Sequence, residues 1–330
     1  MDQNEIQSRI RDIYSALDTP PHQDEIENAI LNECQTGQDV VRFAVSCFAA
    51  HEIFLGHGTE DYWSEAVEIV QAVMRLQPPC DESTLNSRLT KRERTLIAKI
   101  MAMRIFERIP TPYLTHRAFF CGHQFYVDSR VIIPRSPIAE LIDQGFPHLL
   151  GRTPARVLDM CTGSGCIAIS IALRFEGSTE VDAVDISEDA LDVCSINIDA
   201  YGLEDLVTPI RSDLFDSLPE GDKYDLIVAN PPYVDEEELE SLPEEYLKEP
   251  DIALRSGADG LDLARRILTE AGTFLNDDGI LIVEVGGSEE PLVEAFPQVP
   301  FHFVEIRQGG SGVFILTSEQ LKACSELLVD

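Results

Sequence analysis

The sequence predicts an α/β fold, in which a doubly wound, mostly parallel sheet of seven strands follows a small helical domain. Two observations carry this prediction. From Arg156 onward, short apolar segments alternate with helical patterns, as in parallel sheets that helices cover on both faces. The first hundred residues instead show apolar residues at three- and four-residue spacing, which is typical of amphipathic helices.

The N-terminal region, residues 1–108, is predicted to be a bundle of helices that recognises the substrate. Helical spacing is clear in DVVRFAVSCFAAHEIFL and DYWSEAVEIVQAVMRL, and Pro- or Gly-containing segments separate the helices. Another helix, KRERTLIAKIMAMRIFER, gathers basic residues in an otherwise acidic chain: Lys91, Arg92, Arg94, Lys99, Arg104 and Arg108. Such a cluster more often marks a solvated helix face than a binding patch.

Residues 109–135 are predicted to form a linker that contains a β-hairpin. Its two strands are expected in RAFFCGHQFYV and RVIIP, which are short and rich in β-favouring residues. His116 and His123 flank the hairpin without partners at metal-binding or catalytic-base spacing. We therefore expect both histidines to be structural.

Residues 136–330 are predicted to form the α/β domain. Its strands are expected at RVLDM, VDAVDI, VTPIRS, YDLIVAN, ILIVEVG, FHFVEIR and GVFILTS, with helices beginning near Gly165, Ser187, Asp259 and Ser288. Only QGGS joins the last two segments, which is too short for a crossover helix. These two strands should therefore pair antiparallel.

The net charge of -34 and the pI near 4.4 restrict the classes of partner. An acidic surface repels phosphate backbones, so we expect no stable nucleic-acid complex and regard a basic polypeptide as the more natural partner. The alternative is that the acidity only keeps the protein soluble. We expect a cytoplasmic protein that uses no membrane, because no signal peptide or bilayer-spanning run is recognisable. The eight cysteines lack zinc-site spacing, so no metal site is expected.

The first strand of the α/β domain runs into the glycine-rich segment LDMCTGSGCIAISIALRF. Gly163 and Gly165 allow the backbone to turn sharply and approach a ligand closely before the helix begins. With Ala168 they also satisfy the dinucleotide fingerprint, and Asp185 after the second strand could bind a ribose in either kind of cofactor. Asp159 precedes the glycines, where a carboxylate suits a cationic amino-acid group better than a pyrophosphate. This favours S-adenosylmethionine over a nicotinamide cofactor.

The fourth strand ends abruptly in DLIVANPPYVDEEE, at Asn230, Pro231, Pro232 and Tyr233. The prolines could simply terminate a strand. Ligands of open α/β sheets, however, bind at the topological switch, here between the first and fourth strands, so this motif should face Gly163 and Gly165.

The same four residues suit an acceptor that carries a planar NH2 group. The Asn230 side-chain oxygen and the backbone carbonyl of Asn230 or Pro231 could accept its two N–H bonds. Tyr233 could lie against the flat face of the acceptor. Catalysis would then come mainly from positioning and electrostatics.

Four motifs, DMCTGSGCIA, VDAVDIS, RSDLF and ANPPYV, resemble those of class I S-adenosylmethionine-dependent methyltransferases of the Asn-Pro-Pro-Tyr type, which have a Rossmann-like fold. This type includes enzymes acting on base amino groups and on glutamine amides. The upstream segment RIPTPYLTHRAFFCGHQFYVDSRVIIPRSPIAELI is similar to the linker of the protein-glutamine methyltransferases. The resemblance thus implies methyl transfer to the side-chain amide nitrogen of a glutamine.

Within that family, PRSPIAE at residues 134–140 departs from the Pro-Arg-Pro-Glu-Thr-Glu of release-factor enzymes. The chain resembles instead the branch that methylates the third protein of the large ribosomal subunit, which implies the free ribosomal protein as substrate. Three alternatives remain: a release-factor glutamine methyltransferase, a nucleic-acid amino-group methyltransferase, and a non-catalytic ribosome-assembly factor. The complete set of cofactor residues argues against the last.

Carried over motif by motif, the resemblance also implies site residues. The methionine part of the cofactor would lie among Cys161, Thr162, Gly163, Ser164 and Gly165, its ribose at Asp185 and its adenine near Asp213 and Leu214. Leu214 stands where some relatives have an aromatic residue. Asn230 to Tyr233 would hold the glutamine, with Asn230 also beside the cofactor.

Two further segments have alternative interpretations. Arg135 could lie beside the cofactor pocket or form an ion pair that holds the hairpin. The acidic run VDEEELESLPEEYLKEPDIAL after Tyr233 is expected to be a solvated loop or, alternatively, to dock a basic substrate.

Overall fold

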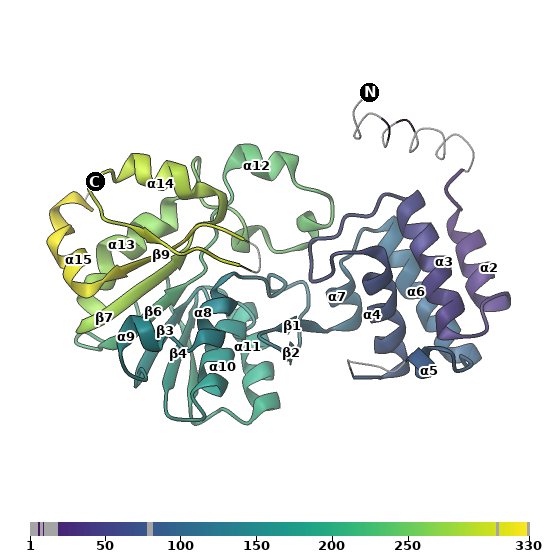
Figure 1. Ribbon diagram of the computed structural model, residues 1–330, viewed down its shortest axis with the longest axis horizontal. Coiled ribbons are helices and arrows are strands. Elements are labelled where there is room, and N and C mark those ends of the chain that lie inside the picture. The colour runs from purple at the N-terminus through teal and green to yellow at the C-terminus, as the bar shows by residue number, and fades with distance from the viewer. Residues whose placement is uncertain (1–5, 7–8, 10–18, 78–81, 308–309, 329–330) are drawn as a thin grey trace. The chain divides into compact units, whose positions relative to one another are not determined.

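The computed structural model describes residues 6, 9, 19–77, 82–307 and 310–328. The chain divides into two compact units, residues 1–115 and residues 116–330 (Figure 1). The boundary falls inside the predicted linker, so the hairpin belongs to the second unit.

The first unit is helical. It contains α2 (Gln23–Asn32), α3 (Gly37–Ala50), α4 (Tyr62–Met74), α5 (Glu82–Leu85), α6 (Lys91–Phe106) and α7 (Thr111–Thr115). Capping boxes begin α3 at Thr36 and α6 at Thr90, where each threonine accepts a backbone N–H in the first turn. Fully buried side chains such as Phe48, Ile69 and Met101 form the core of the unit.

The expectation that the basic face of α6 is merely solvated is wrong for Arg104. Its side chain is buried, and its Nε donates to Glu65 Oε1 over 2.6 Å while Nη2 donates to the Phe54 carbonyl. Thr111 Oγ1 donates to the same Glu65 oxygen. The periodicity of α6 turns this arginine inward, where a buried charge requires a partner.

The hairpin is shorter than predicted and lies entirely within the first expected segment. β1 (Ala118–Phe120) pairs antiparallel with β2 (His123–Phe125) across a turn in which Cys121 and Gly122 have positive φ. Residues 130–134 form no strand, so the second predicted strand is wrong. A side chain takes the place of a strand partner there, because Ile133 N donates to Glu249 Oε1.

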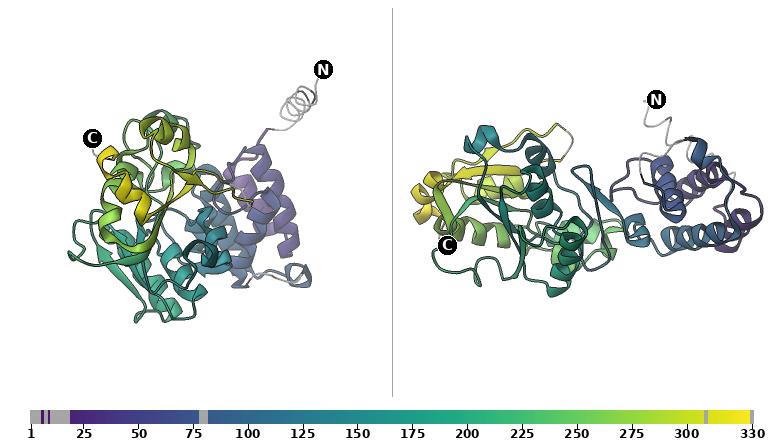
Figure 2. Two further views of the ribbon diagram at one scale, coloured as in Figure 1. Left: turned by 60° about the vertical axis from the view of Figure 1, so that its left-hand side comes forward. Right: turned by 90° about the horizontal axis from the view of Figure 1, so that it is seen from below.

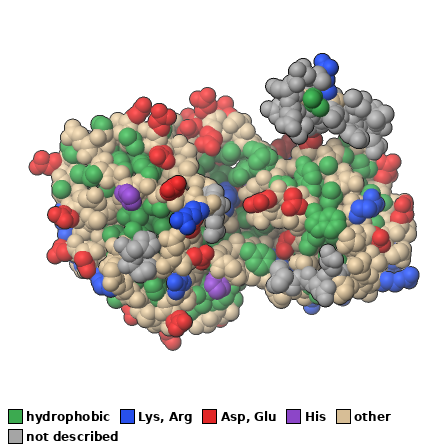
Figure 3. Space-filling model, viewed as in Figure 1, with side chains coloured by type: hydrophobic (Ala, Val, Ile, Leu, Met, Phe, Trp, Pro, Cys, Tyr) green, Lys and Arg blue, Asp and Glu red, His purple; other side chains and the backbone are tan. Residues whose placement is uncertain are grey.

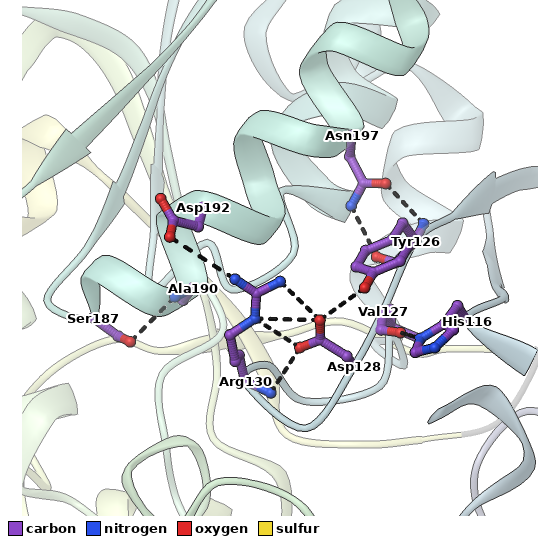
Figure 4. A network of polar contacts seen from close by, with 9 residues as sticks. All are labelled: His116, Tyr126, Val127, Asp128, Arg130, Ser187, Ala190, Asp192 and Asn197. Atoms are coloured by element: carbon purple, nitrogen blue, oxygen red, sulfur yellow. Dashed lines mark hydrogen bonds and ion pairs between the residues drawn. The ribbon is translucent and has the colours of Figure 1, made fainter. Parts of the chain in front are cut away.

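Helix α11 (Glu188–Tyr201) anchors the chain after the hairpin (Figure 4). Asn197 Oδ1 accepts Tyr126 N, and its Nδ2 donates to the carbonyls of Tyr126 and Ser164. His116 stacks on the Tyr126 ring, and its Nδ1 lies 3.1 Å from the Val127 carbonyl. One buried amide therefore connects the linker with the glycine-rich loop.

The second unit contains the predicted seven-stranded sheet, in the order β5-β4-β3-β6-β7-β9-β8. Its strands are β3 (Arg156–Met160), β4 (Glu180–Asp185), β5 (Val207–Arg211), β6 (Tyr224–Ala229), β7 (Leu275–Glu284), β8 (His302–Phe303) and β9 (Val313–Thr317). β3 to β7 pair in parallel, whereas β9 is antiparallel to both β7 and β8. The α/β class, the switch between β3 and β6, and the antiparallel final pair are confirmed.

The predicted extent of two strands is wrong. β7 begins at Leu275 rather than Ile280, and β8 covers only two residues of FHFVEIR. β8 lies at the edge of the sheet, and beyond it Arg307 N donates to the Glu140 side chain instead of to a strand. The QGGS connection includes residues 308 and 309, which lie outside the described residues.

Helices cover both faces of this sheet (Figure 1, Figure 2). The helices of this unit are α8 (Ile138–Gln144), α9 (Pro147–Leu150), α10 (Cys166–Arg174), α11 (Glu188–Tyr201), α12 (Glu236–Ser241), α13 (Asp262–Phe274), α14 (Glu289–Ala295) and α15 (Ser318–Ala323), of which α12 lies in the acidic run and buries no residue. On β6, Leu226 and Val228 pack in the core with α10, whereas Ile227 and Ala229 pack in the core with α13. This two-sided burial explains why the strand is an unbroken apolar run.

Across the described part of the chain, no helix has both the length and the apolar character needed to cross a bilayer.

Candidate active site

A cavity of about 480 Å³ opens beyond the carboxyl ends of the central strands. Of the predicted site residues, its lining includes Cys161, Gly163, Asp185, Asp213, Leu214, Asn230 and Pro232. Asp159, Thr162, Ser164, Gly165, Pro231 and Tyr233 are not part of this lining. The structure therefore brings both motifs to one cavity and leaves several motif residues behind its walls.

The glycine-rich loop folds tightly between β3 and α10. Cys161, Gly163 and Gly165 all have positive φ, and Thr162 N donates to the Val184 carbonyl of the neighbouring strand. A Cβ at position 165 would lie 2.6 Å from Cys194 Sγ. Gly165 is therefore needed for packing against α11, and Gly163 is the glycine at the cavity.

Asp185 ends β4 and lies on the cavity wall, as predicted. Its two oxygens accept backbone N–H groups from Gly163 and Ser187, each over 2.9 Å. Burial raises the pKa of this carboxyl, and the two backbone donors act in the opposite direction. Asp185 thus fixes the glycine-rich loop while facing the cavity.

Asp159 lies beneath the loop instead of on the cavity wall. Its Oδ2 accepts from Thr162 Oγ1 over 2.5 Å and from Ala168 N over 3.0 Å. Its Oδ1 is buried without a hydrogen-bond partner among the residues that the structure describes. Burial raises the pKa of Asp159 to about 7. The carboxyl therefore supports the loop and leaves one acceptor oxygen unused.

An apolar wall follows β4 and β5. Leu214 is buried with a positive φ, and Ile186, which the sequence did not single out, lines the same cavity with 46% of its surface exposed. Asp213 also lines it, with Oδ1 accepting from Arg266 Nη1 over 2.6 Å. The signal for Ile186 was its position directly after the strand-ending Asp185.

The acceptor motif divides between two cavities. Asn230 and Pro232 line the first, whereas Tyr233 lines a neighbouring cavity of about 530 Å³. The Tyr233 hydroxyl donates to Glu284 Oε1 over 3.0 Å, and burial beside this carboxyl raises the pKa of the phenol well above its ordinary value. The expectation that all four residues face the glycine loop is therefore corrected for Pro231, which is buried, and for Tyr233.

The linker contributes a residue that the sequence did not reveal. Arg130 lines the first cavity and is held by Asp128 through Nε and Nη2, with Asp192 at 3.8 Å (Figure 4). The Arg130 guanidinium holds the pKa of Asp128 at about 2. Tyr126 OH donates to the same carboxylate. Nothing in the local sequence indicates that this segment returns to the cavity.

Arg135 forms an ion pair, which was one of its two predicted roles. Its guanidinium donates to both oxygens of Glu249 over 2.5 and 2.6 Å and lies over the Tyr246 ring. The partner, Glu249, lies in the acidic run, so the ion pair joins the segment after the hairpin to that run. That run contains α12 and two 3₁₀ turns, and Glu245 and Glu249 are buried. The interpretation as a solvated loop is therefore wrong for this part of it.

Within the described ranges, no group of three or more His, Cys, Asp or Glu side chains is placed to hold a metal ion.

Comparison with known proteins gives consistent matches. Residues 139–259 match the family model of the methyltransferase small domain. A ribosomal protein uL3 glutamine methyltransferase of Francisella tularensis is 44% identical over 294 residues, which are 88% of this chain and 93% of that protein. One of Bordetella pertussis is 44% identical over 299 residues, which are 90% and 99% of the two chains. The solved catalytic domain of hMettl16 in complex with an RNA hairpin is 18% identical, with a TM-score of 0.47 over 68% of this chain and 80% of that chain.

Proposed function

The chain belongs to the family of ribosomal protein uL3 glutamine methyltransferases, and from this premise we propose that it methylates the side-chain amide nitrogen of a glutamine in uL3. The observation that supports the proposal is the shared cavity, because Gly163, Asp185 and Asn230 all belong to its lining. Such a cavity at the switch between β3 and β6 can hold a cofactor and an acceptor together.

The residues of the first cavity fit S-adenosylmethionine. Asp185 supplies carboxylate oxygens at the end of β4 for the ribose hydroxyls, and Ile186 and Leu214 supply an apolar wall for the adenine. The unused Oδ1 of Asp159 is a buried acceptor beneath the loop, suited to an ammonium donor. When bound, the cofactor supplies an electrophilic methyl group on a sulfonium.

Asn230 is the residue that binds and orients the acceptor amide. The nitrogen of a glutamine amide is a weak nucleophile, because its lone pair is delocalised into the carbonyl. The Asn230 side-chain oxygen accepts one N–H and a backbone carbonyl of Asn230 or Pro231 accepts the other, which directs the nitrogen toward the cofactor. These acceptors also stabilise the positive charge that develops on the nitrogen during transfer.

The proposed partner is free uL3 before ribosome assembly, in the cytoplasm. The chain carries a net charge of -34, and acidic side chains are scattered over the face drawn in Figure 3. This charge favours encounter with a basic protein and disfavours a stable nucleic-acid complex. We assign substrate recognition to three elements: the helical unit, the hairpin segment that ends in residues 134–140, and the acidic run at residues 234–254.

A labelling assay tests the proposal. The purified chain is incubated with methyl-labelled S-adenosylmethionine and, in parallel, free uL3, assembled large subunits, a release factor, or DNA. We expect fast labelling of free uL3 only, with one glutamine identified by mass spectrometry. A uL3 variant with asparagine at that position is the matched control and should stay unlabelled. Faster labelling of the release factor would reject the substrate, and labelling of DNA alone would reject the glutamine chemistry as well.

A further inference from the structure

The ring of Tyr233 is held by the segment that follows β7. A Cβ at position 286 would lie 2.4 Å from Tyr233 Cε2, so the ring packs directly on the bare backbone of Gly286. Ser288 Oγ donates to the Tyr233 carbonyl over 3.2 Å. The Tyr233 hydroxyl donates to Glu284. Side chain and backbone of Tyr233 are thus fixed by one short segment, Glu284–Ser288.

Glu284 connects this segment to the linker as well. It ends β7, the strand next to β6, and only 3% of its surface is exposed. Its Oε2 accepts from Ser136 Oγ over 2.6 Å, while Oε1 accepts from Tyr233. One carboxyl group therefore joins the start of α8 to the acceptor motif.

Burial of a carboxyl group at the end of a strand lowers the free energy of unfolding. Ion burial is strongly unfavourable, and an apolar residue would complete β7 more stably. Burial raises the pKa of Glu284 to about 7, and the hydroxyls of Ser136 and Tyr233 and the charge of Arg135 act against this rise. Glu140 and Glu238 line the same cavity and add negative charge around it. Fold stability alone does not account for a carboxyl in this place.

The cavities on the two sides of the motif separate the effects of Glu284 from cofactor binding. Pro232 lines the first cavity, and the next residue in the chain, Tyr233, lines the second. Because the two residues are consecutive, their Cα atoms are only about 3.8 Å apart. Glu284 lines only the second. Its hydrogen bond with Tyr233 connects Glu284 to the motif whose residues Asn230 and Pro232 line the first cavity.

We infer that Glu284 is a positioning residue for methyl transfer, which holds Tyr233, and through Tyr233 the acceptor amide, beside Asn230 and Pro232 in the motif that borders the cofactor cavity. This inference rests on the proposed function. Gly286 and Ser288 complete the same support. The reaction itself proceeds at Asn230, and Glu284 sets the geometry of Tyr233, three residues further along the motif.

A double-mutant cycle tests the inference with uL3 as substrate. Glu284→Gln and Tyr233→Phe should each lower kcat by roughly tenfold to a hundredfold, since small misplacements have effects of that size. The dissociation constant of S-adenosylmethionine, measured by calorimetry, should stay within about twofold, because neither residue lines the first cavity. The double variant should be no slower than the slower single variant, because the two groups act as a unit. Glu290→Gln, the same change at an exposed glutamate on α14, is the matched control with wild-type kcat.

The pH profile of kcat separates positioning from a merely structural role. The wild-type rate should rise as Glu284 ionises around pH 7, since a carboxylate is the stronger acceptor for both hydroxyls. The pH profile of Glu284→Gln should lack the rise that is caused by ionisation of Glu284. Any rise that is caused by ionisation of Asp159 should remain in this variant. If Glu284→Gln does not fold, Tyr233→Phe alone decides, and full kcat in that variant overturns the inference. Three further results would overturn the inference: additive effects of the two substitutions, an unchanged kcat in the single variants, or pH profiles of the wild type and Glu284→Gln that differ only in scale. Absence of uL3 labelling by the wild type would instead reject the proposed function.

Discussion

The two halves of the proposed active site, one for the cofactor and one for the acceptor, are built differently. In the cofactor half, Asp159 holds Thr162 and Asp185 holds Gly163, so the contacts join a single loop to two adjacent parallel strands. In the acceptor half, Tyr233 depends on Glu284–Ser288, and Glu284 in turn on Ser136. The first half is assembled from neighbouring elements and the second from segments far apart in the chain.

This difference indicates which substitutions should change cofactor binding and which should change the turnover rate. A substitution in the cofactor half should alter the dissociation constant of S-adenosylmethionine. One in the acceptor half should alter kcat, because its residues position the amide and leave the first cavity intact. A substitution in one half that changed both the dissociation constant and kcat would contradict this division of roles.

Asn230→Ala should have the largest effect. It removes the acceptor that orients the amide nitrogen, and the loss of one such group lowers kcat by about 10²–10³. Single-turnover methyl transfer to uL3 measures this loss, and calorimetry should show cofactor affinity largely retained. A folded variant with wild-type turnover would remove Asn230 from the mechanism.

Asp185→Ala should weaken cofactor binding next most strongly. Hydrogen bonds to charged groups contribute about 1.5–3 kcal/mol, which corresponds to a dissociation constant roughly tenfold to a hundredfold higher. Asp185 also holds Gly163 N and Ser187 N, so the loop loses support as well. Asp185→Asn is the matched variant, because it keeps the size of the side chain. An unchanged dissociation constant in both variants would remove Asp185 from the binding site.

Gly286→Ala should have a smaller effect, confined to the acceptor half. The new methyl would overlap the Tyr233 ring, and φ at this position is +49°. We expect kcat to fall about tenfold through displacement of the ring, with unchanged cofactor affinity. Gly287→Ala is the matched control, since no heavy atom lies within 4 Å of a Cβ at that position. Equal kcat values for the two variants would show that packing of the Tyr233 ring on Gly286 does not affect turnover.

The smallest predicted effect concerns stability and pH. Glu284 has a pKa raised from 4.5 to about 7, so the folded state retains a proton that the unfolded state releases as pH rises between these values. Its stabilising contribution is therefore complete below pH 4.5 and is lost as pH rises through 7. Glu284→Gln cannot ionise. The free energy of unfolding of the wild type should thus fall relative to the variant between pH 5 and pH 8, as measured by urea unfolding. A difference independent of pH would show that Glu284 titrates normally.

The local sequence predicts that Gly163 and Asp185 lie at one cavity, but it does not predict the contacts around Tyr233. Gly163 and Asp185 were recognisable because a glycine-rich turn and a strand-ending acid are local patterns. The contacts of Tyr233 with Glu284 and of Arg135 with Glu249 join residues distant in the chain, and no local pattern specifies them. One local feature does mark Glu284, because it is the single charged residue within the apolar segment ILIVEVG.

The antiparallel strand β9 also determines when the site can form during synthesis. Strands β3 to β6 and the residues between 251 and 266 that complete the lining of the first cavity have all been made once Arg266 has left the ribosome. The acceptor half must wait for β9, because Val285 N donates to the Gly312 carbonyl and β9 pairs along β7. Such distant pairings form late and slowly. A nascent chain should therefore become able to hold its methyl donor before it can use it, and the emergence of β9 marks the onset of activity.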